Sequence, residues 1–221
     1  TKLLAAQKGY NALMASIKRP AKVAGKRVAI IGGGPTGIAA AYFCGRAGIE
    51  TTIFERESCL GGVPRHVIPA FRIANEVIEK DIALMEQYGV EVKCGAPAPS
   101  VDELKKMGYT HILLAVGAWK PGKLDIAGDV AGAIQWMKGV KAGNIGVAGN
   151  IAVIGGGNTA MDAARLARRS GAEHVTLVYR RTRKYMPADE HELALALADG
   201  VEFAELAAPV KQADGVLTCE K

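Results

Sequence analysis

Short apolar runs alternate with amphipathic and alanine-rich stretches along most of the chain. Such runs are typical of buried parallel strands, and the stretches between them have the 3.6-residue period of helices. Strands are predicted in the first half at residues 28–31, 51–54, 90–94 and 110–116. Helices are predicted there at residues 2–18, 36–47, 73–85 and 101–107. This order predicts an α/β fold with a parallel sheet and crossover helices.

The same order begins again at residue 151. Strands are predicted at 151–154 and 175–179, with a helix at 159–169 between them. A further helix is predicted to begin at Pro187, because proline is favoured in the first turn and Asp189 and Glu190 would then lie near the positive end of the helix dipole.

These patterns together predict two Rossmann-like dinucleotide-binding domains with parallel sheets. The expected organisation is a lead-in helix and linker, a first domain, a glycine-rich crossing with one amphipathic stretch at 133–140, and a second domain. Their predicted bounds are residues 1–24, 25–118, 119–150 and 151–221.

Composition narrows the class of protein. The chain has 221 residues, of which 49% are apolar, which is enough for real hydrophobic cores. The apolar run from Ile112 to Trp119 is far shorter than the ~20 residues of a membrane span. Residues 1–24 lack the pattern of a secretory signal. We therefore expect no membrane span and a cytoplasmic protein.

The net charge of +6 raises the question of nucleic acid. Aromatic residues are only 5% of the chain, however, and the basic residues concentrate near residue 180. The charge is therefore attributed to anionic cofactors, and no nucleic-acid partner is expected.

Glycine turns follow the first strand of each predicted domain. In the first copy, Gly32 permits the tight turn, Gly34 lets a pyrophosphate approach the backbone, and Gly37 lets helix and strand pack closely. Glu55 ends the second strand, where a carboxylate accepts hydrogen bonds from a ribose diol and repels a 2′-phosphate. This copy predicts FAD or NAD rather than NADP; the alternative is a glycine turn without a ligand.

The second copy contains Gly155, Gly157 and, at the third glycine position, Ala160. Arg180 and Arg181 stand in place of the carboxylate, and arginine suits the 2′-phosphate of NADP. The alternative is a solvated basic face that also includes Arg165, Arg168, Arg169, Arg183 and Lys184.

The four cysteines form no C-x-x-C pair, which argues against a zinc ribbon or a local iron–sulfur set. Cys59 is the only cysteine near the position where a flavoprotein disulfide reductase carries its dithiol, so dithiol chemistry is not expected. His66, in the same segment, is a candidate polar contact to a flavin.

Several motifs in order resemble the small subunit of bacterial NADPH-dependent glutamate synthase. The module is also similar to the flavin region of dihydropyrimidine dehydrogenase and to the flavin subunit of a selenate reductase. The resemblance runs from Gly25 to Phe203 and rests on the segments 32–37, 60–65, 68–72, 155–162 and 179–187.

The resemblance implies that NADPH gives a hydride to FAD and that electrons leave through an iron–sulfur domain or subunit to a downstream catalytic domain or subunit. It implies no catalytic side chain and no metal ligand, because the two rings need only be held together. The residues implied to hold FAD are Gly32, Gly34, Pro35, Gly37, Glu55, Arg56, Gly62, Ala115, Val116 and Gly117. Those implied to hold NADPH, beside the turn itself, are Asn158, Thr159, Arg180 and Arg181.

The chain departs from this family pattern in three ways. Val116 replaces a threonine, and Ala74-Asn75 replace a Pro-Lys pair that is usual in glutamate synthase. The return segment that closes the family's flavin domain and its cysteine-rich domain are also absent from the sequence, which predicts a fragment with an incomplete FAD domain. Two other functions stay open: a nucleotide-binding structural or sensor domain without turnover, and a stand-alone flavin-dependent reductase.

Overall fold

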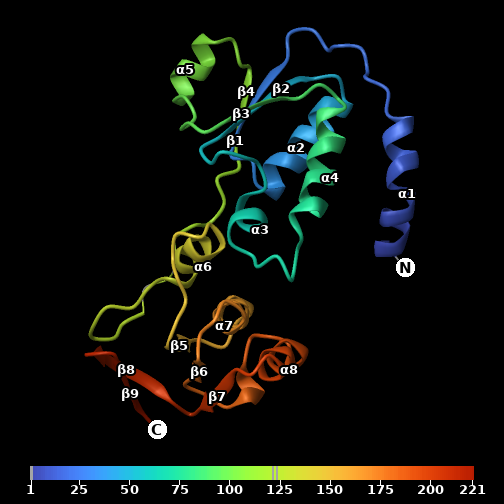
Figure 1. Ribbon diagram of the computed structural model, residues 1–221. Helices are drawn as coiled ribbons and strands as arrows, with labels where there is room; N and C mark the ends of the chain where they lie inside the picture. The colour runs from blue at the N-terminus through green and yellow to red at the C-terminus, as the bar shows by residue number, and fades with distance from the viewer. Residues whose placement is uncertain (1, 121, 123) are drawn as a thin grey trace. The chain divides into compact units, whose positions relative to one another are not determined.

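The computed structural model describes residues 2–120, 122 and 124–221, so positions 121 and 123 of the predicted crossing lie outside the described residues. The chain divides into two compact units. Unit 1 comprises Thr1–His66 and Ala70–Gly117, and unit 2 comprises Val67–Pro69 and Ala118–Lys221. Each unit is built on its own parallel sheet (Figure 1). No helix in the described part of the chain is long and apolar enough to cross a membrane.

Unit 1 contains a four-stranded parallel sheet in the order β3-β2-β1-β4. Its strands are β1 (Arg27–Ile31), β2 (Glu50–Glu55), β3 (Glu91–Cys94) and β4 (His111–Leu114). Its helices are α1 (Lys2–Ser16), α2 (Pro35–Arg46), α3 (Gly62–His66), α4 (Asn75–Glu86) and α5 (Val101–Lys106).

Alternation along the strands gives the sheet of unit 1 two buried faces. Ile30 and Ile53 face α2 and α4, where they join a core that includes Met85. Their neighbours Ala29 and Phe54 belong to a second core with residues on or beside α5. Figure 1 shows α2 and α4 side by side on one face and α5 on the other. Helices on both faces explain why the central strand β1 is apolar from Val28 to Ile31.

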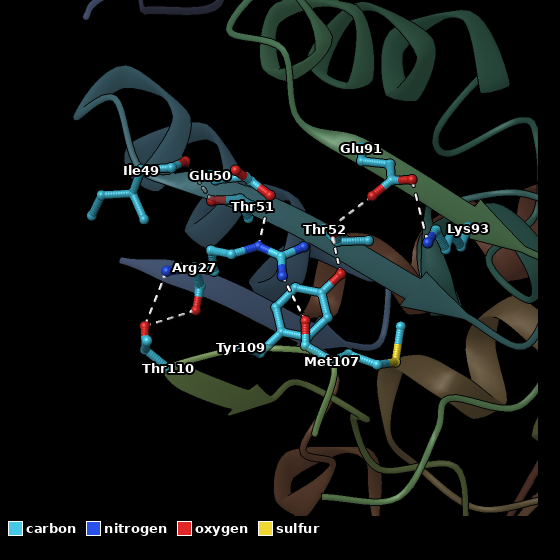
Figure 2. Close-up of polar contacts among 10 residues, drawn as sticks. All are labelled: Arg27, Ile49, Glu50, Thr51, Thr52, Glu91, Lys93, Met107, Tyr109 and Thr110. Atoms are coloured by element: carbon cyan, nitrogen blue, oxygen red, sulfur yellow. Dashed lines mark hydrogen bonds and ion pairs between the residues drawn. The ribbon is translucent and has the colours of Figure 1, made fainter. Parts of the chain in front are cut away.

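Polar side chains connect the amino ends of the strands in unit 1 (Figure 2). Arg27, the first residue of β1, donates to Glu50 Oε1 at 2.7 Å and to the carbonyl of Met107 at 2.6 Å. Tyr109 donates to Thr52 Oγ1, which donates to Glu91 Oε2, each at 2.9 Å. The bond from Thr52 lowers the pKa of Glu91. This edge is occupied by its own side chains, which leaves the carboxyl edge for a ligand.

Unit 2 contains a three-stranded parallel sheet in the order β5-β6-β7 and a separate antiparallel hairpin, β8-β9. The strands are β5 (Asn150–Ile154), β6 (His174–Tyr179), β7 (Glu202–Glu205), β8 (Ala208–Ala213) and β9 (Val216–Glu220). The helices are α6 (Ala133–Lys141), α7 (Asn158–Arg169), the 3-10 turn η1 (Arg183–Tyr185) and α8 (Glu190–Ala198). Alanines on one side of α7 are fully buried, so this helix packs closely on the sheet.

The structure confirms most predicted elements to within a few residues, but the predicted start of the last helix is wrong. The helix α8 begins at Glu190 rather than at Pro187. Asp189 is its N-cap and accepts from the amide of His191 at 2.8 Å. Met186 is extended, as a residue before proline prefers, and the amide of Ala188 donates to the carbonyl of Gly156 at 3.0 Å. The segment before α8 is therefore held to the second glycine turn.

Candidate nucleotide-binding sites

The first glycine turn lies between β1 and α2 at the carboxyl edge of its sheet. The amide of Gly32 donates to the carbonyl of Phe54 at 2.8 Å, and Gly32 has a φ of +107°. A Cβ atom at Gly32 would overlap the carbonyl of Ala115, whose own amide donates to Ile31 at 2.8 Å. The turn is therefore enclosed by the end of β4, and Ala115, one of the residues implied to hold FAD, lies beside Gly32.

Three further glycines of unit 1 permit close backbone approach. A Cβ atom at Gly37 would overlap the carbonyl oxygen of Gly32, which confirms the close packing of helix and strand that the motif predicts. A Cβ atom at Gly62 would lie 2.8 Å from the Cα of Gly34. Gly34 is the N-cap of α2, with Pro35 as its first residue, and no side chain caps the helix. The amino end of α2 therefore presents backbone amides and a positive dipole to a phosphate.

Glu55 holds the first glycine turn in place through hydrogen bonds to backbone amides. Its side chain is only 6% exposed, and Oε2 accepts from the amide of Gly33 at 2.6 Å. The other oxygen, Oε1, accepts from the amide of Glu57 at 2.9 Å. Each carboxylate oxygen has a second lone pair for a ribose hydroxyl. The structure thus adds a role that the motif did not predict, because Glu55 holds the turn through two backbone amides.

The remaining predicted residues of unit 1 lie around this turn and are more open. Arg56 follows Glu55 directly, and its side chain is ion-paired with Glu57 at 3.6 Å. Val116 is 57% exposed, and Gly117 has a φ of +69°. Because the Val116 side chain is exposed and Gly117 has none, these two residues after β4 add little packing to the end of the strand.

The second glycine turn repeats the geometry of the first between β5 and α7. The amide of Gly155 donates to the carbonyl of Val178 at 3.0 Å, and Gly155 has a φ of +137°. A Cβ atom at Gly155 would lie 3.4 Å from the Cβ of Ala160, so the alanine methyl fits at the third glycine position. A Cβ atom at Gly157 would contact nothing within 4 Å. Exposed Asn158 and Thr159 then begin α7.

The hydrogen bonds of the two turns correct the prediction that Arg180 and Arg181 stand at the position equivalent to Glu55. Gly32 pairs with Phe54 and Gly155 with Val178, so the residue equivalent to Glu55 is Tyr179 rather than an arginine. The Tyr179 ring lies where a Cβ atom at Gly156 would approach it to 2.6 Å. Arg180 and Arg181 come directly after this position.

Arg180 and Arg181 line a cavity of about 330 Å³ at the carboxyl end of β6. The other lining residues are Thr182, Tyr185 and Leu206. Tyr185 lies in the segment 179–187 that carries the family resemblance, but the sequence analysis gave neither Tyr185 nor Leu206 a role. In the described parts of the chain, no hydrogen bond or ion pair engages the side chains of Arg180 and Arg181.

Other basic residues of this region bond to their own unit, unlike a uniformly solvated basic face. Arg165 and Arg169 bind the carboxylate of Asp199 at 2.8 and 2.7 Å. The hydrogen bond from Arg169, together with that from Arg165, lowers the pKa of Asp199 to about 2. Arg168 donates to the carbonyl of Ala172 at 2.9 Å. Arg183 pairs with Glu205 at 3.9 Å.

The structure also shows the state of the four cysteines and the polar contact of His66. Cys44, Cys59, Cys94 and Cys219 are free thiols, and burial raises the pKa of Cys94. His66 is the last residue of α3, and its Nε2 lies 3.2 Å from the carbonyl of Cys59, so its polar contact is to the backbone just before that helix.

Comparison with known proteins places this geometry in a family. A family model described as pyridine nucleotide-disulphide oxidoreductase matches residues 26–214. YgfK of Escherichia coli (strain K12), which is named an oxidoreductase, is 40% identical over 225 residues, or 98% of this chain and 22% of YgfK. The NADPH glutamate synthase small chain of Azospirillum brasilense is 32% identical over 213 residues, or 87% of this chain and 44% of that protein. The chain thus spans less than half the length of both relatives.

A solved structure supports the fold. Thioredoxin reductase from Lactococcus lactis superposes with a TM-score of 0.61 at 24% identity, over 88% of this chain and 69% of that one. The fold is therefore an FAD/NAD(P)-binding Rossmann-like fold with parallel sheets, as predicted. The resemblance to the glutamate synthase small chain is also confirmed. The chain belongs to the pyridine nucleotide-disulphide oxidoreductase family.

Proposed function

We propose that this chain is an NADPH-dependent flavoprotein module in which unit 2 binds NADPH and unit 1 binds FAD. The chain is a flavin/NAD(P) oxidoreductase domain related to the glutamate synthase small chain. The observation that carries the finer assignment is the contrast between two turns of equal geometry. One is followed by a buried carboxylate, Glu55, and the other by the arginines at 180 and 181. A carboxylate disfavours a 2′-phosphate, whereas arginines bind one.

The first turn fits the pyrophosphate and adenosine of FAD. Its glycines leave the backbone accessible, α2 begins without a side-chain cap, and Glu55 retains lone pairs for a ribose. The residues proposed to hold FAD are Gly32, Gly34, Pro35, Gly37, Glu55, Arg56, Gly62, Ala115, Val116 and Gly117. FAD, when bound, would accept a hydride from NADPH and release electrons singly.

The second turn fits NADPH by the same reasoning. Open space at Gly157 and the amino end of α7 suit the pyrophosphate, and the cavity at Arg180 and Arg181 suits the 2′-phosphate. The residues proposed to hold NADPH are Gly155, Gly157, Asn158, Thr159, Ala160, Arg180 and Arg181. All of these groups bind and orient, and none is asked to act as an acid or a base.

We further propose that electrons pass to an iron–sulfur domain or subunit and then to a downstream catalytic domain or subunit. The support is kinship with a protein named as one chain of glutamate synthase. The family resemblance of the ordered motifs implies the same route.

An anaerobic titration of the 221-residue chain, reconstituted with FAD, tests the central proposal. NADPH and NADH are added in parallel while the visible absorbance of the flavin is recorded. We expect bleaching by NADPH at much lower concentration than by NADH. Binding of both nucleotides without bleaching would favour the structural or sensor domain. Bleaching by NADH at equal or lower concentration would contradict the assignment of unit 2.

A further inference from the structure

An apolar groove lies between α2 and α4 in unit 1. The two helices pack side by side on one face of the sheet (Figure 1), and the groove between them has a volume of about 530 Å³. Ile38 and Ile78 line the groove and belong to the core. Phe43 and Val77 line it too, yet they are 63% and 54% exposed. Large apolar side chains that stay this exposed around one groove are typical of an interaction surface.

The length of the groove matches two turns of an α-helix. Its lining runs along α4 from Val77 to Leu84 and along α2 from Pro35 to Phe43. Seven or eight residues of helix rise about 10–12 Å. Apolar side chains at positions i, i+4 and i+7 of a second helix cover the same distance. This spacing is the usual pattern of anchors when a helix docks in a groove.

The charge beside the groove is negative, although the whole chain has a net charge of +6. The sequence of α4 contains four carboxylates and a single basic residue, Lys80. Glu79 is ion-paired with Arg65 at 2.5 Å. Asp81 is exposed and is the one charged residue among the described residues that line the groove. A partner that complements this groove therefore carries a lysine or an arginine next to its apolar face.

The helix α1 contacts α4 without filling the groove. The Tyr10 hydroxyl donates to the carbonyl of Lys80 at 3.1 Å, and the Lys80 ammonium lies 5.5 Å from the centre of the Tyr10 ring. The described residues that line the groove include none from α1. The contact of α1 with α4 therefore leaves the exposed side chains of Phe43 and Val77 uncovered.

We propose that the groove between α2 and α4 binds a basic amphipathic helix of a partner protein. The apolar face of that helix covers Phe43 and Val77, and a lysine or arginine at its edge pairs with Asp81. The inference goes beyond the proposed function and does not depend on it, because these three residues are not among those proposed to bind a dinucleotide.

Fluorescence anisotropy with two labelled synthetic peptides tests this inference. The first peptide has about 15 residues, enough to form a helix, with leucines at i, i+4 and i+7 among alanines and lysines. The second has glutamate in place of every lysine. We expect the basic peptide to bind more tightly than the acidic one. Phe43→Ala and Val77→Asp should each weaken the basic peptide by about 30-fold, the loss typical of a hot-spot residue.

Two matched controls separate the groove from general effects. Val101→Asp changes an exposed valine of α5, outside the groove, and should leave binding unchanged. Asp81→Lys should reduce the preference for the basic peptide by about 5-fold, since it removes one exposed ion pair. Glu86→Lys, on α4 but outside the groove lining, should change this preference less. Circular dichroism checks that each variant is folded.

Three results would overturn the proposal. The first is no binding of the basic peptide to the unaltered chain, or equal affinity for the two peptides. The second is an equal loss of binding in Val77→Asp and Val101→Asp. The third is a dimer of the unaltered chain, seen by analytical ultracentrifugation, that Val77→Asp dissociates, because the groove would then belong to a second copy of this chain.

Discussion

At the scale of single residues, the two glycine turns differ at one equivalent position. Glu55 fills it in unit 1 and Tyr179 fills it in unit 2, and each contacts the middle glycine of its turn. The carboxylate accepts two backbone amides, while the tyrosine ring packs on the turn and its hydroxyl reaches Tyr185. One position therefore shapes the turn in both units and gives the two turns chemically different surroundings.

Glu55→Gln is predicted to destabilise unit 1. An amide has one acceptor oxygen, so the amide of either Gly33 or Glu57 would lose its partner in a buried place. The expected loss is about 1–3 kcal/mol in the free energy of unfolding, measured with urea. Glu86→Gln, at an exposed position of α4, is the control. Equal stability of the two variants would show that the Glu55 bonds contribute nothing.

Sequence reasoning found the residues of the glycine motifs but not all of their partners. Gly37 was predictable because its role depends only on the local packing of one helix on one strand. The hydrogen bonds of Glu55 to two backbone amides depend on tertiary contacts, as does the position of Leu206 in the cavity lining. The spacing of residues in the sequence does not reveal such contacts. Tyr185 lies in the segment 179–187 that carries the family resemblance. An aromatic residue so close to Arg180 and Arg181 is a sequence signal from which a role in nucleotide binding could have been predicted.

At the scale of elements, α7 and α8 are joined by one carboxylate. Asp199 caps the carboxyl end of α8 and binds two arginines of α7, one of which, Arg165, is 6% exposed. The paired arginines hold the pKa of Asp199 at about 2, below its usual 3.8. A carboxyl with a lowered folded-state pKa adds stability above its unfolded pKa, and this contribution is lost as the pH falls.

Asp199→Asn is predicted to destabilise the chain at pH 7 by about 2 kcal/mol, because it removes the carboxylate that binds Arg165 and Arg169. The difference from the unaltered chain should shrink as the pH is lowered from about 4 to about 2, the interval between the unfolded and folded pKa values. Denaturation at pH 7, 4 and 2.5 measures this. Glu173→Gln, on the surface, serves as the control. A difference that stays constant with pH would rule out the ion pairs as its cause.

Elements with strong apolar periodicity were predictable, and weakly patterned ones were not. The run 28–31 and the alanine-rich helix after it appear in the structure nearly as expected. The strands β7, β8 and β9 were missed because their sequences mix charged and apolar residues on partly exposed surfaces. The start of α8 was misplaced because Pro187 is compatible with a first helical turn, yet its neighbours bond to the second glycine turn.

At the scale of the whole molecule, the two units repeat one turn, but β2 ends in the acidic Glu55 whereas β6 ends in Tyr179 and is followed by Arg180 and Arg181. Neither unit alone distinguishes a hydride-transfer module from a simple nucleotide-binding domain. The proposed assignment of FAD to the turn with Glu55 and of NADPH to the turn near Arg180 and Arg181 depends on both units.

The double variant Arg180→Gln with Arg181→Gln is predicted to weaken NADPH binding by about 10- to 150-fold, since charge-assisted hydrogen bonds contribute ~1.5–3 kcal/mol. Binding of NADH, which lacks the 2′-phosphate, should change little, so the preference between the two dinucleotides should fall. Fluorescence titration with both dinucleotides measures the preference. Lys184→Gln, at an exposed neighbour outside the cavity lining, is the control. Equal losses for NADPH and NADH would contradict a 2′-phosphate site.

The two hydrogen bonds that the Glu55 carboxylate accepts from backbone amides affect how unit 1 would bind a nucleotide. The amides of Gly33 and Glu57 are bonded to Glu55 within unit 1 itself, so the shape of the turn does not depend on a bond to a nucleotide. The entropy of ordering that loop is lost during folding and not during association. Release of a nucleotide would then leave these two hydrogen bonds in place, so exchange at this turn would need no local refolding.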